Sequence, residues 1–428
     1  MKRIVLLVFW SFLALCGSVN CQVFTKEIQI MGDSSVIRRI TTDKWMVYSN
    51  YKGTTRFYAV SASGATANYL QISAKDTHIY DFRIIKDTVF FCGSVNDNGA
   101  GQALLGYFPL AGFPNVTVKC KTFDYLKSFR KMAVFTAGGQ VHVVMTSTKR
   151  SNNAGAMVDA RRVAGNSWEV NTVDNMLVTE TFDDVVVTSK HIIFSSRYFR
   201  LIPQDAPGYD FTRIWFIDRP VYAGTSIFST SIFTRSIQSP SPTDAVLLEN
   251  IGNDCFISVN PIAGNYLLAS RFGGTNYDAS AQFHVDGTTQ LKDLENNQLY
   301  DTHEVLVNTQ TSTRRGSYIY HLKESMFDQG GAYYRHYYDN DFIHSLCWDN
   351  TPDYLFAASG INLGNLQQRF YRYCVTIWGC ARRESFSSER VVLECPDRKI
   401  DIKVIIDHPN FEPINTYHNY ELVNTICE

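Results

Sequence analysis

The chain has 428 residues, of which 45% are hydrophobic, 14% aromatic and 19% charged, so it can build a large core and is not of the disordered class. Its 40 basic residues nearly balance its 41 acidic residues, which disfavours nucleic acid as a partner. The sequence lacks the local signatures of metalloproteases, α/β-hydrolases, phosphate-binding loops and dinucleotide-binding folds.

The first 21 residues have the pattern of an export signal. Met1-Lys2-Arg3 precede an apolar run from Ile4 to Leu15, and smaller, more polar residues follow as far as Cys21. The run is shorter than the ~20 residues that a membrane-spanning helix needs. We therefore predict a signal peptide over residues 1–21, a mature chain that begins at Gln22, and export to the periplasm, the cell surface or the extracellular space.

Neither a lipid anchor nor a second membrane segment is expected. The segment Leu13-Ala14-Leu15-Cys16 has a bulky leucine before the cysteine, where lipid attachment requires a small residue. No other stretch approaches 18 consecutive apolar residues, so we expect no transmembrane segment after cleavage.

One type of segment recurs along most of the chain. It has a polar turn, an apolar strand, a small or polar pair and a second apolar strand, which is the pattern of a β-hairpin. Equivalent positions in the first strands are Val47, Phe90, Val143, Ile193, Phe256, Val305 and Leu355. The clearest second strands are Arg56 to Val60, Ala103 to Phe108, Arg213 to Ile217, Ser317 to Leu322 and Arg369 to Tyr373. Successive equivalent positions lie 43 to 63 residues apart, with a period of roughly fifty.

This period has the length of a propeller blade, because four strands of ~5–6 residues with their turns take about 40–50 residues. A small twisted sheet cannot bury both faces alone, whereas sheets stacked around an axis cover one another. We therefore predict an all-β fold, a β-propeller of seven four-stranded blades over residues 22–400, with six or eight blades as alternatives. Residues 401–428 are expected to form a C-terminal strand or tail.

Two segments are candidates for the strand that completes the last blade. Gln22 to Ile30 has the composition of an extended strand, and Ile400 to Ile406 alternates apolar and polar residues over most of its length. Either strand would protect a sheet edge that otherwise invites aggregation.

Eight cysteines remain after signal cleavage, an even number that permits disulfides in an exported protein. Four of them lie between Cys374 and Cys427, so the C-terminal tail is the part most suited to disulfide bonds; the alternative is that the cysteines are buried free thiols. The candidate disulfide cysteines are Cys92, Cys120, Cys255, Cys347, Cys374, Cys380, Cys395 and Cys427. No pair has the two-residue spacing of a zinc knuckle, and no metal site is predicted from them.

The strand from Asp87 to Gly93, the partner segment Gly106-Tyr107-Phe108 and the export signal together resemble uncharacterised secreted β-propeller proteins of anaerobic gut and oral bacteria. This resemblance implies an exported propeller and carries no catalytic residues. The repeat signatures of WD40 proteins and the aspartate boxes of sialidases are absent from the sequence, which weakens a sialidase interpretation.

One stretch near the end of the predicted propeller is unusually rich in tyrosine and charge. Tyrosine rings can stack on sugars or on peptide side chains, while an arginine and carboxylates can orient a ligand by charge-assisted hydrogen bonds. The candidate ligand-binding residues are Tyr333, Tyr334, Arg335, His336, Tyr337, Tyr338, Asp339 and Asp341. The alternative is that these tyrosines pack between blades.

Two short acidic stretches, Asn96 to Gly99 and Asp339 to Asp341, space oxygen ligands as calcium loops do but lack the distal glutamate of an EF-hand. They are more typical of turns, so calcium is a secondary candidate and no other cofactor is predicted. His142, His191 and His303 fall in or beside expected strands, where a histidine usually has a structural role.

We therefore expect an exported binding module for a protein, a peptide or a glycan, rather than an enzyme. The alternatives are a carbohydrate-active hydrolase or lyase with a site in the central funnel, and a structural subunit of a cell-surface assembly. Convergence of titratable side chains from three or more repeats at the axis would favour the enzyme.

Overall fold

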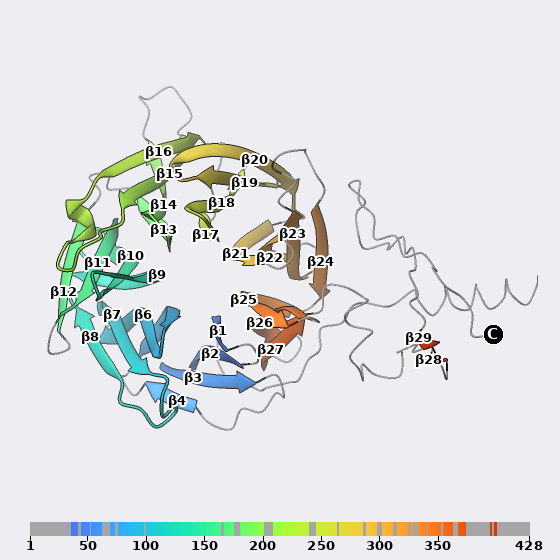
Figure 1. The fold of residues 1–428 in the computed structure, drawn as a ribbon, viewed down its shortest axis with the longest axis horizontal. Helices are drawn as coiled ribbons and strands as arrows, with labels where there is room; N and C mark the ends of the chain where they lie inside the picture. Colours follow the sequence, from blue (N-terminus) through green and yellow to red (C-terminus); the bar gives the residue numbers. More distant parts are fainter. Residues whose placement is uncertain are drawn as a thin grey trace, which may run out of the picture.

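A computed structural model describes residues 36–41, 44–51, 53–61, 69–72, 76–97, 100–163, 167–174, 180–200, 209–238, 245–262, 265–285, 288–297, 302–310, 315–323, 327, 333–339, 341–351, 354–362, 367–373, 394–395 and 398–399. Seven antiparallel sheets stand around a central axis (Figure 1). The first strand of each sheet lies nearest the centre of the ring, and later strands lie progressively further out (Figure 1).

The sheets are numbered in chain order. Sheet 1 contains β1 (Ile37–Thr41), β2 (Lys44–Tyr51), β3 (Thr54–Ser61) and β4 (Tyr69–Ile72), and sheet 2 contains β5 (Thr77–Ile85), β6 (Thr88–Asp97), β7 (Ala100–Pro109) and β8 (Lys119–Phe123). Sheet 3 contains β9 (Leu126–Ala137), β10 (Gln140–Lys149), β11 (Gly155–Arg162) and β12 (Trp168–Asp174), and sheet 4 contains β13 (Thr181–Val187), β14 (His191–Arg200), β15 (Tyr209–Asp218) and β16 (Ile232–Gln238). Sheet 5 contains β17 (Leu247–Gly252), β18 (Cys255–Ile262), β19 (Tyr266–Gly273) and β20 (Asn276–His284), and sheet 6 contains β21 (Thr288–Asn297), β22 (Thr302–Gln310), β23 (Arg315–Lys323) and β24 (Tyr333–Asp339). Sheet 7 contains β25 (Asp341–Thr351), β26 (Tyr354–Asn362) and β27 (Gln367–Tyr373).

The all-β propeller predicted from the repeats is confirmed, but the strand count is not. All seven equivalent positions, from Val47 to Leu355, lie in the second strand of a sheet, and the five partner segments lie in third strands. The prediction of seven four-stranded blades is wrong, because six sheets have four strands while sheet 7 has three within the described part of the chain. The repeat pattern marks the second and third strands of each sheet, so it does not show how many strands flank them.

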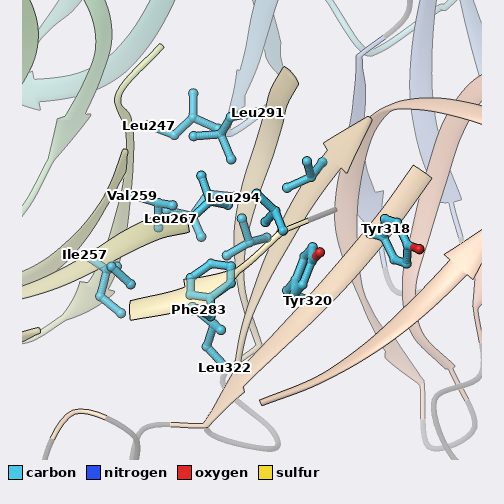
Figure 2. Packing of buried hydrophobic residues seen from close by; sticks show 14 of the residues in the cluster. Leu247, Ile257, Val259, Leu267, Phe283, Leu291, Leu294, Tyr318, Tyr320 and Leu322 are labelled. Atoms are coloured by element: carbon cyan, nitrogen blue, oxygen red, sulfur yellow. The ribbon is translucent and has the colours of Figure 1, made fainter. Parts of the chain in front are cut away.

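Apolar side chains between neighbouring sheets supply the core. Figure 2 shows one such layer, in which Phe283 of sheet 5 lies beside Tyr320 of sheet 6 with ring centroids 5.2 Å apart. The fully buried residues of this layer include Ile257 and Val259 from β18 and Val305 from β22. Because each sheet is covered on both faces by its neighbours, burial of apolar area depends on the closed ring.

The part of the chain outside the ring is described only in β28 (Glu394–Cys395) and β29 (Arg398–Lys399), which pair with each other. The signal peptide, the candidate closing strands and the tail over residues 401–428 lie outside the described residues. Within the described residues, no helix is both long and apolar enough to cross a membrane.

Four of the eight candidate disulfide cysteines have described side chains, and no two of these four are bonded to each other, so disulfides in this chain stay a prediction. Cys92 and Cys347 are buried, while Cys255 is half-buried and Cys120 is exposed. The structure describes the backbone of Cys395 but not its side chain, and Cys374, Cys380 and Cys427 lie outside the described residues.

Gly106 in the partner segment of the resemblance has a packing role. It pairs with Phe91 across β6 and β7, and a Cβ atom at Gly106 would lie 2.2 Å from Cζ of the Phe91 ring. Phe91 is fully buried and packs against Phe57 with ring centroids 5.6 Å apart. A side chain at position 106 would therefore displace a ring that links sheets 1 and 2.

We expect Gly106→Ala to lower the free energy of unfolding by about 2–3 kcal/mol, because overpacking a well-packed core has a cost of this size. The control is Gly273→Ala, where the new Cβ would meet its nearest atom at 3.5 Å. Urea denaturation of both variants measures the difference. Equal stability of the two variants would show that the Phe91 ring moves aside freely.

Candidate functional site

Four inner strands carry a β-bulge at the same place. In β5, β13, β21 and β25 the register with the second strand shifts by one residue at this point. The extra residues are Tyr80, Asp183, Lys292 and His344. A bulge turns the next side chain in a new direction, and here that side chain is an aspartate in three strands and Ser345 in the fourth.

Each of these aspartates joins its own sheet to the next one. Asp81 Oδ1 accepts a hydrogen bond from Phe82 N at 2.9 Å, and Asp81 Oδ2 accepts one from Met132 N of sheet 3 at 3.1 Å. A buried carboxylate that accepts two backbone N–H groups satisfies donors on both strands. We name this arrangement the aspartate clasp.

The same clasp recurs in sheets 4 and 6. Asp184 accepts from Val185 N at 2.8 Å and from Leu248 N of sheet 5 at 3.0 Å. Asp293 accepts from Leu294 N at 3.1 Å and from Leu346 N of sheet 7 at 2.8 Å. The clasps therefore occupy alternate sheets of the ring.

Ser345 and Arg38 connect sheet 7 to sheet 1. Ser345 Oγ donates to Asp293 Oδ2 at 2.7 Å and accepts from Ile37 N at 3.4 Å. Arg38 Nη2 then contacts Asp81 Oδ1 at 3.1 Å. Polar contacts therefore run without interruption from sheet 6 through sheets 7, 1 and 2 to sheet 3.

Charged side chains from five sheets lie next to the clasps. This axial charged group consists of Arg38, Arg83, Lys131, Glu249 and Glu295, each on the first strand of its sheet. Burial alone would raise the pKa of Asp81, but Arg83, Arg38 and Lys131 hold it below its ordinary value. Asp81 is therefore an ionised carboxylate within a basic part of the axis.

Glu249 lies in the acidic part of the axis. Burial raises its pKa well above the ordinary value, and the negative charges of Glu295 and Asp293 raise it further. The positive charge of Arg83 opposes this shift, although sheets 2 and 5 are not neighbours in the ring. The two residues therefore interact across the axis, and burial together with the neighbouring acids favours the protonated form of Glu249.

The bulge residues form a second level of polar groups. The guanidinium carbon of Arg130 lies 4.6 Å from the ring centroid of Tyr80. Burial and the positive charge of Lys292 lower the pKa of His344 to about 4, which keeps this imidazole neutral at physiological pH. The bulge residues of sheets 2 and 7 therefore lie near basic side chains of sheets 3 and 6.

The tyrosine-rich stretch lies elsewhere. Tyr333 to Asp339 form β24, whose only partner among the described residues is β23, and Asp341 begins β25. Alternate positions of a strand belong to opposite faces of the sheet, so these positions do not share one surface. The structure describes the backbone of these eight residues and not their side chains, so their role in ligand binding stays a prediction.

Among the described residues, no group of three or more His, Cys, Asp or Glu side chains is arranged to hold a metal ion. Of the two candidate calcium loops, Asn96 and Asp97 end β6, Asp339 ends β24 and Asp341 begins β25. Asn98, Gly99 and Asn340 lie outside the described residues.

The three strand histidines contact other side chains, and His303 packs near the ring of Phe327. His142 Nδ1 lies 3.0 Å from Asp159 Oδ1, and both side chains are fully buried. His191 Nδ1 lies 3.1 Å from Asp254 Oδ1, which joins a turn of sheet 4 to a turn of sheet 5. His303 is buried in β22.

Sequence reasoning missed the axial charged group, although a signal for the clasps was present. Asp81, Asp184 and Asp293 each stand inside an otherwise strand-like run, and they are separated by 103 and 109 residues. These separations are about twice the period of the hairpins. A charged residue in a buried strand needs partners, so its recurrence at a multiple of the period indicates a shared contact.

Comparisons with known proteins support the fold alone. No family model matches the chain, and no curated protein matches it. Drosophila Semaphorin 2a is similar in structure with a TM-score of 0.50, 8% sequence identity, and coverage of 82% of this chain and 75% of that one. The β-propeller domain of the Trilobed protease from Pyrococcus furiosus gives a TM-score of 0.45 at 7% identity, covering 86% of this chain and 100% of that one. An uncharacterised protein from Listeria monocytogenes gives a TM-score of 0.42 at 10% identity, covering 85% and 100%.

We expect Asp293→Ala to lower the free energy of unfolding by about 3 kcal/mol, because it leaves the buried Leu346 N–H and the Ser345 hydroxyl without their acceptor. The matched control is Asp278→Ala, since the Asp278 side chain is 52% exposed and pairs with Arg271 at the rim. Urea denaturation measures both. Similar losses in the two variants would contradict a special role for the clasp.

The pKa shifts of Glu249 and His344 predict opposite pH effects. Because the pKa of Glu249 is raised in the folded state, its protonation stabilises the fold at acidic pH, and this contribution is lost as the pH rises through the folded-state pKa. We therefore expect Glu249→Gln to gain stability over wild type as the pH rises above the ordinary carboxyl range. His344, with a pKa of about 4 instead of 6.5, makes the fold less stable as the pH falls through this window. We therefore expect His344→Gln to gain up to about 3 kcal/mol over wild type as the pH falls from 6.5 to 4.

Thermal unfolding of wild type and both variants between pH 4 and pH 8 measures these slopes. Variants whose pH profiles run parallel to wild type would contradict the assigned shifts.

Proposed function

We propose that this protein is an exported binding module whose ligand, a glycan, a peptide or a protein segment, binds at the axis of the ring. The carrying observation is the half-buried Glu249, which lies beside Glu295 and across the axis from Arg83 and does not take part in a clasp between sheets. Loops and rims of a propeller can vary independently of the core, so a ligand site at the axis is compatible with the fold.

Not every charged group near the axis is available to a ligand. The carboxylates of Asp81, Asp184 and Asp293 already accept backbone N–H groups from two sheets each. The Glu249 side chain is half-buried and belongs to none of the three clasps. It is therefore the group best suited to meet a ligand.

The protonation states define the chemistry of the ligand. A protonated Glu249 carboxyl donates one hydrogen bond, while the carboxyl of its neighbour Glu295 supplies acceptor oxygens. Arg83 adds further donors on the opposite side of the axis. Adjacent donors and acceptors fit hydroxyl and amide groups, which both donate and accept, so sugars and peptide backbones are the ligand classes that this arrangement favours.

A binding role predicts different results for two substitutions at one position. Glu249→Gln keeps a donor and should leave affinity within about threefold, whereas Glu249→Ala removes the donor and should weaken binding about tenfold or more. Asp278→Asn is the control at the rim. Glycan and peptide arrays would identify a hit, and calorimetry would compare the variants.

Equal affinity of wild type and Glu249→Ala for that hit would refute the axial site. If Tyr334→Ala abolishes binding of that ligand instead, the result would favour the tyrosine-rich strand β24 as the binding site.

A carbohydrate-active hydrolase is the second candidate, and the raised pKa of Glu249 favours it specifically. A protonated carboxyl beside an ionised one is the pairing that glycosidases use as general acid and nucleophile or base. In that case Glu249 would protonate the leaving oxygen, and Glu295 would act on the sugar directly or through water. The convergence of titratable groups from more than three sheets also meets the criterion that we set for an enzyme.

Turnover separates the two functions. An enzyme should lose about 10²–10⁴-fold in rate through Glu249→Gln, because an amide cannot transfer a proton, although its affinity for the glycan persists. The measurement is the release of reducing ends from each glycan that the array identifies. A glycan that wild type binds but never cleaves would refute the hydrolase and support the binding module.

Export, like the likeness to secreted bacterial propellers, is part of this proposal and rests on residues 1–21. N-terminal sequencing of secreted protein should begin at Gln22. A structural subunit of a surface assembly remains the third alternative, and no observation on the described residues favours it.

A further inference from the structure

Basic residues are concentrated in one stretch of the chain. Residues 119–150 contain seven basic residues and one acidic residue, Asp124, whereas the other residues of the chain include 33 basic and 40 acidic ones. This basic stretch spans β8, β9 and β10, which belong to sheets 2 and 3. Positive charge is therefore localised on two neighbouring sheets of a chain whose net charge is −1.

Two exposed cations of the basic stretch lie at one end of sheet 3. Leu126 at the start of β9 pairs with Lys149 at the end of β10, so the start of β9 lies beside the turn over residues 150–154. Lys127 Nζ donates to Asn153 Oδ1 of this turn at 3.3 Å. Arg150 Nη1 donates to the carbonyl oxygen of residue 124, just before β9, at 3.3 Å. Lys127 and Arg150 therefore flank the same pair of connections.

A bulge in β9 carries the positive charge further toward the axis. The register shift between Met145 and Ser147 leaves Arg130 and Lys131 opposite Thr146 alone. A β-bulge bends its strand and redirects the side chains that it contains. Arg130 is exposed, while Lys131 is half-buried and belongs to the axial charged group. Since β9 is the strand of sheet 3 nearest the axis (Figure 1), positive charge continues from the turn to the axial charged group.

The contacts that hold the exposed cations do not cancel their charge. Lys127 donates to an amide oxygen and Arg150 to a backbone carbonyl, while Arg130 lies over the ring of Tyr80 at 4.6 Å from its centroid. Each of these partners is neutral, so it orients the side chain and leaves its positive charge in place. Cations that are held in this way attract an anionic ligand.

We propose that Lys127, Arg130 and Arg150, together with Tyr125, form a basic patch that binds an acidic glycan, a sugar chain that bears carboxylate or sulfate groups. A guanidinium binds either group through paired hydrogen bonds. The Tyr125 side chain is 50% exposed, and its ring meets that of Phe123 edge-on with centroids 6.3 Å apart. An exposed ring that is fixed by a neighbour can stack on a sugar.

The distribution of charge favours a short acidic ligand over nucleic acid. A nucleic-acid site usually belongs to a domain with a large excess of basic residues, whereas acids outnumber bases outside the basic stretch. That surplus of negative charge repels a long polyanion from the rest of the surface. The choice of a glycan over an acidic protein rests on the proposed function of the axis, which the patch reaches through Lys131.

Titration calorimetry with two acidic hexasaccharides tests the proposal. A heparin hexasaccharide supplies sulfate groups, a galacturonate hexasaccharide supplies carboxylates alone, and neutral maltohexaose is the reference. We expect at least one acidic probe to bind in about 50 mM NaCl and to lose about tenfold in affinity at about 200 mM, because salt screens charge. Binding of neither acidic probe, or equal affinity for maltohexaose, would overturn the proposal.

Two triple variants remove equal charge from different places. The patch variant carries Lys127→Gln, Arg130→Gln and Arg150→Gln. The control variant removes three exposed cations outside the basic stretch, through Lys44→Gln, Lys190→Gln and Arg235→Gln. We expect the patch variant to lose about 30-fold in affinity and the control less than about threefold. Equal losses would show a general effect of net charge and overturn the proposal.

Other anions serve as competitors. A hexaglutamate peptide or a thymidine hexanucleotide that binds wild type more tightly than both hexasaccharides would reassign the patch to protein or to nucleic acid. Either result would overturn the glycan as its ligand.

Lysine acetylation of the wild-type chain gives a measurement that does not depend on the folding of any variant. A bound anion keeps the Lys127 amine protonated and therefore unreactive. The hexasaccharide should slow acetylation of Lys127 about fivefold or more and leave Lys44 and Lys190 unchanged. Equal protection of all three lysines, or of none, would contradict the patch.

The variant Glu249→Ala separates this proposal from the axial site. A hexasaccharide that binds Glu249→Ala as tightly as wild type, but is lost by the patch variant, would refute the axial site and support the patch. Loss of binding through Glu249→Ala, with no effect of the patch variant, would support the axial site and overturn the patch.

Discussion

The aspartate clasp is the interaction on which the organisation of this ring depends. The strands of neighbouring sheets do not pair with one another, so the sheets are joined by side-chain contacts and by isolated backbone hydrogen bonds, such as that from Thr77 N to Gly53 O. A buried carboxylate that accepts N–H groups from its own strand and from the next sheet fixes the relative height of the two inner strands. The apolar layers then pack in a register that the clasps have set.

The clasps also create the candidate site. The bulges of β5 and β21 direct Asp81 and Asp293 toward the next sheet. Arg83 and Glu295, two positions further along the same strands, then lie beside the axis. The basic side, with Arg38, Arg83 and Lys131, faces an acidic side with Glu249 and Glu295. Burial and, after it, the negative charge of Glu295 raise the pKa of Glu249, which favours adjacent hydrogen-bond donors and acceptors at the axis.

Sequence reasoning succeeded where the evidence is local and failed where it is not. The hairpins, their period and the propeller fold follow from apolar runs such as Thr88 to Cys92, whose pattern is independent of the rest of the chain. The strand count of sheet 7 was wrong, because the period marks hairpins rather than whole blades. The tyrosine-rich stretch attracted attention through its density in the sequence, yet it forms the outer strand of sheet 6, away from the axial charged group.

The sequence by itself determined the secondary structure and the repeat, because alternation of apolar and polar residues directly reflects the two faces of a strand. Only the tertiary structure decided which residues meet at the axis. Arg83 and Glu249 are 166 positions apart and belong to sheets that are not adjacent, so no spacing or motif connects them. Closing the ring brings them together, and burial beside Glu295 then sets the protonation state of Glu249.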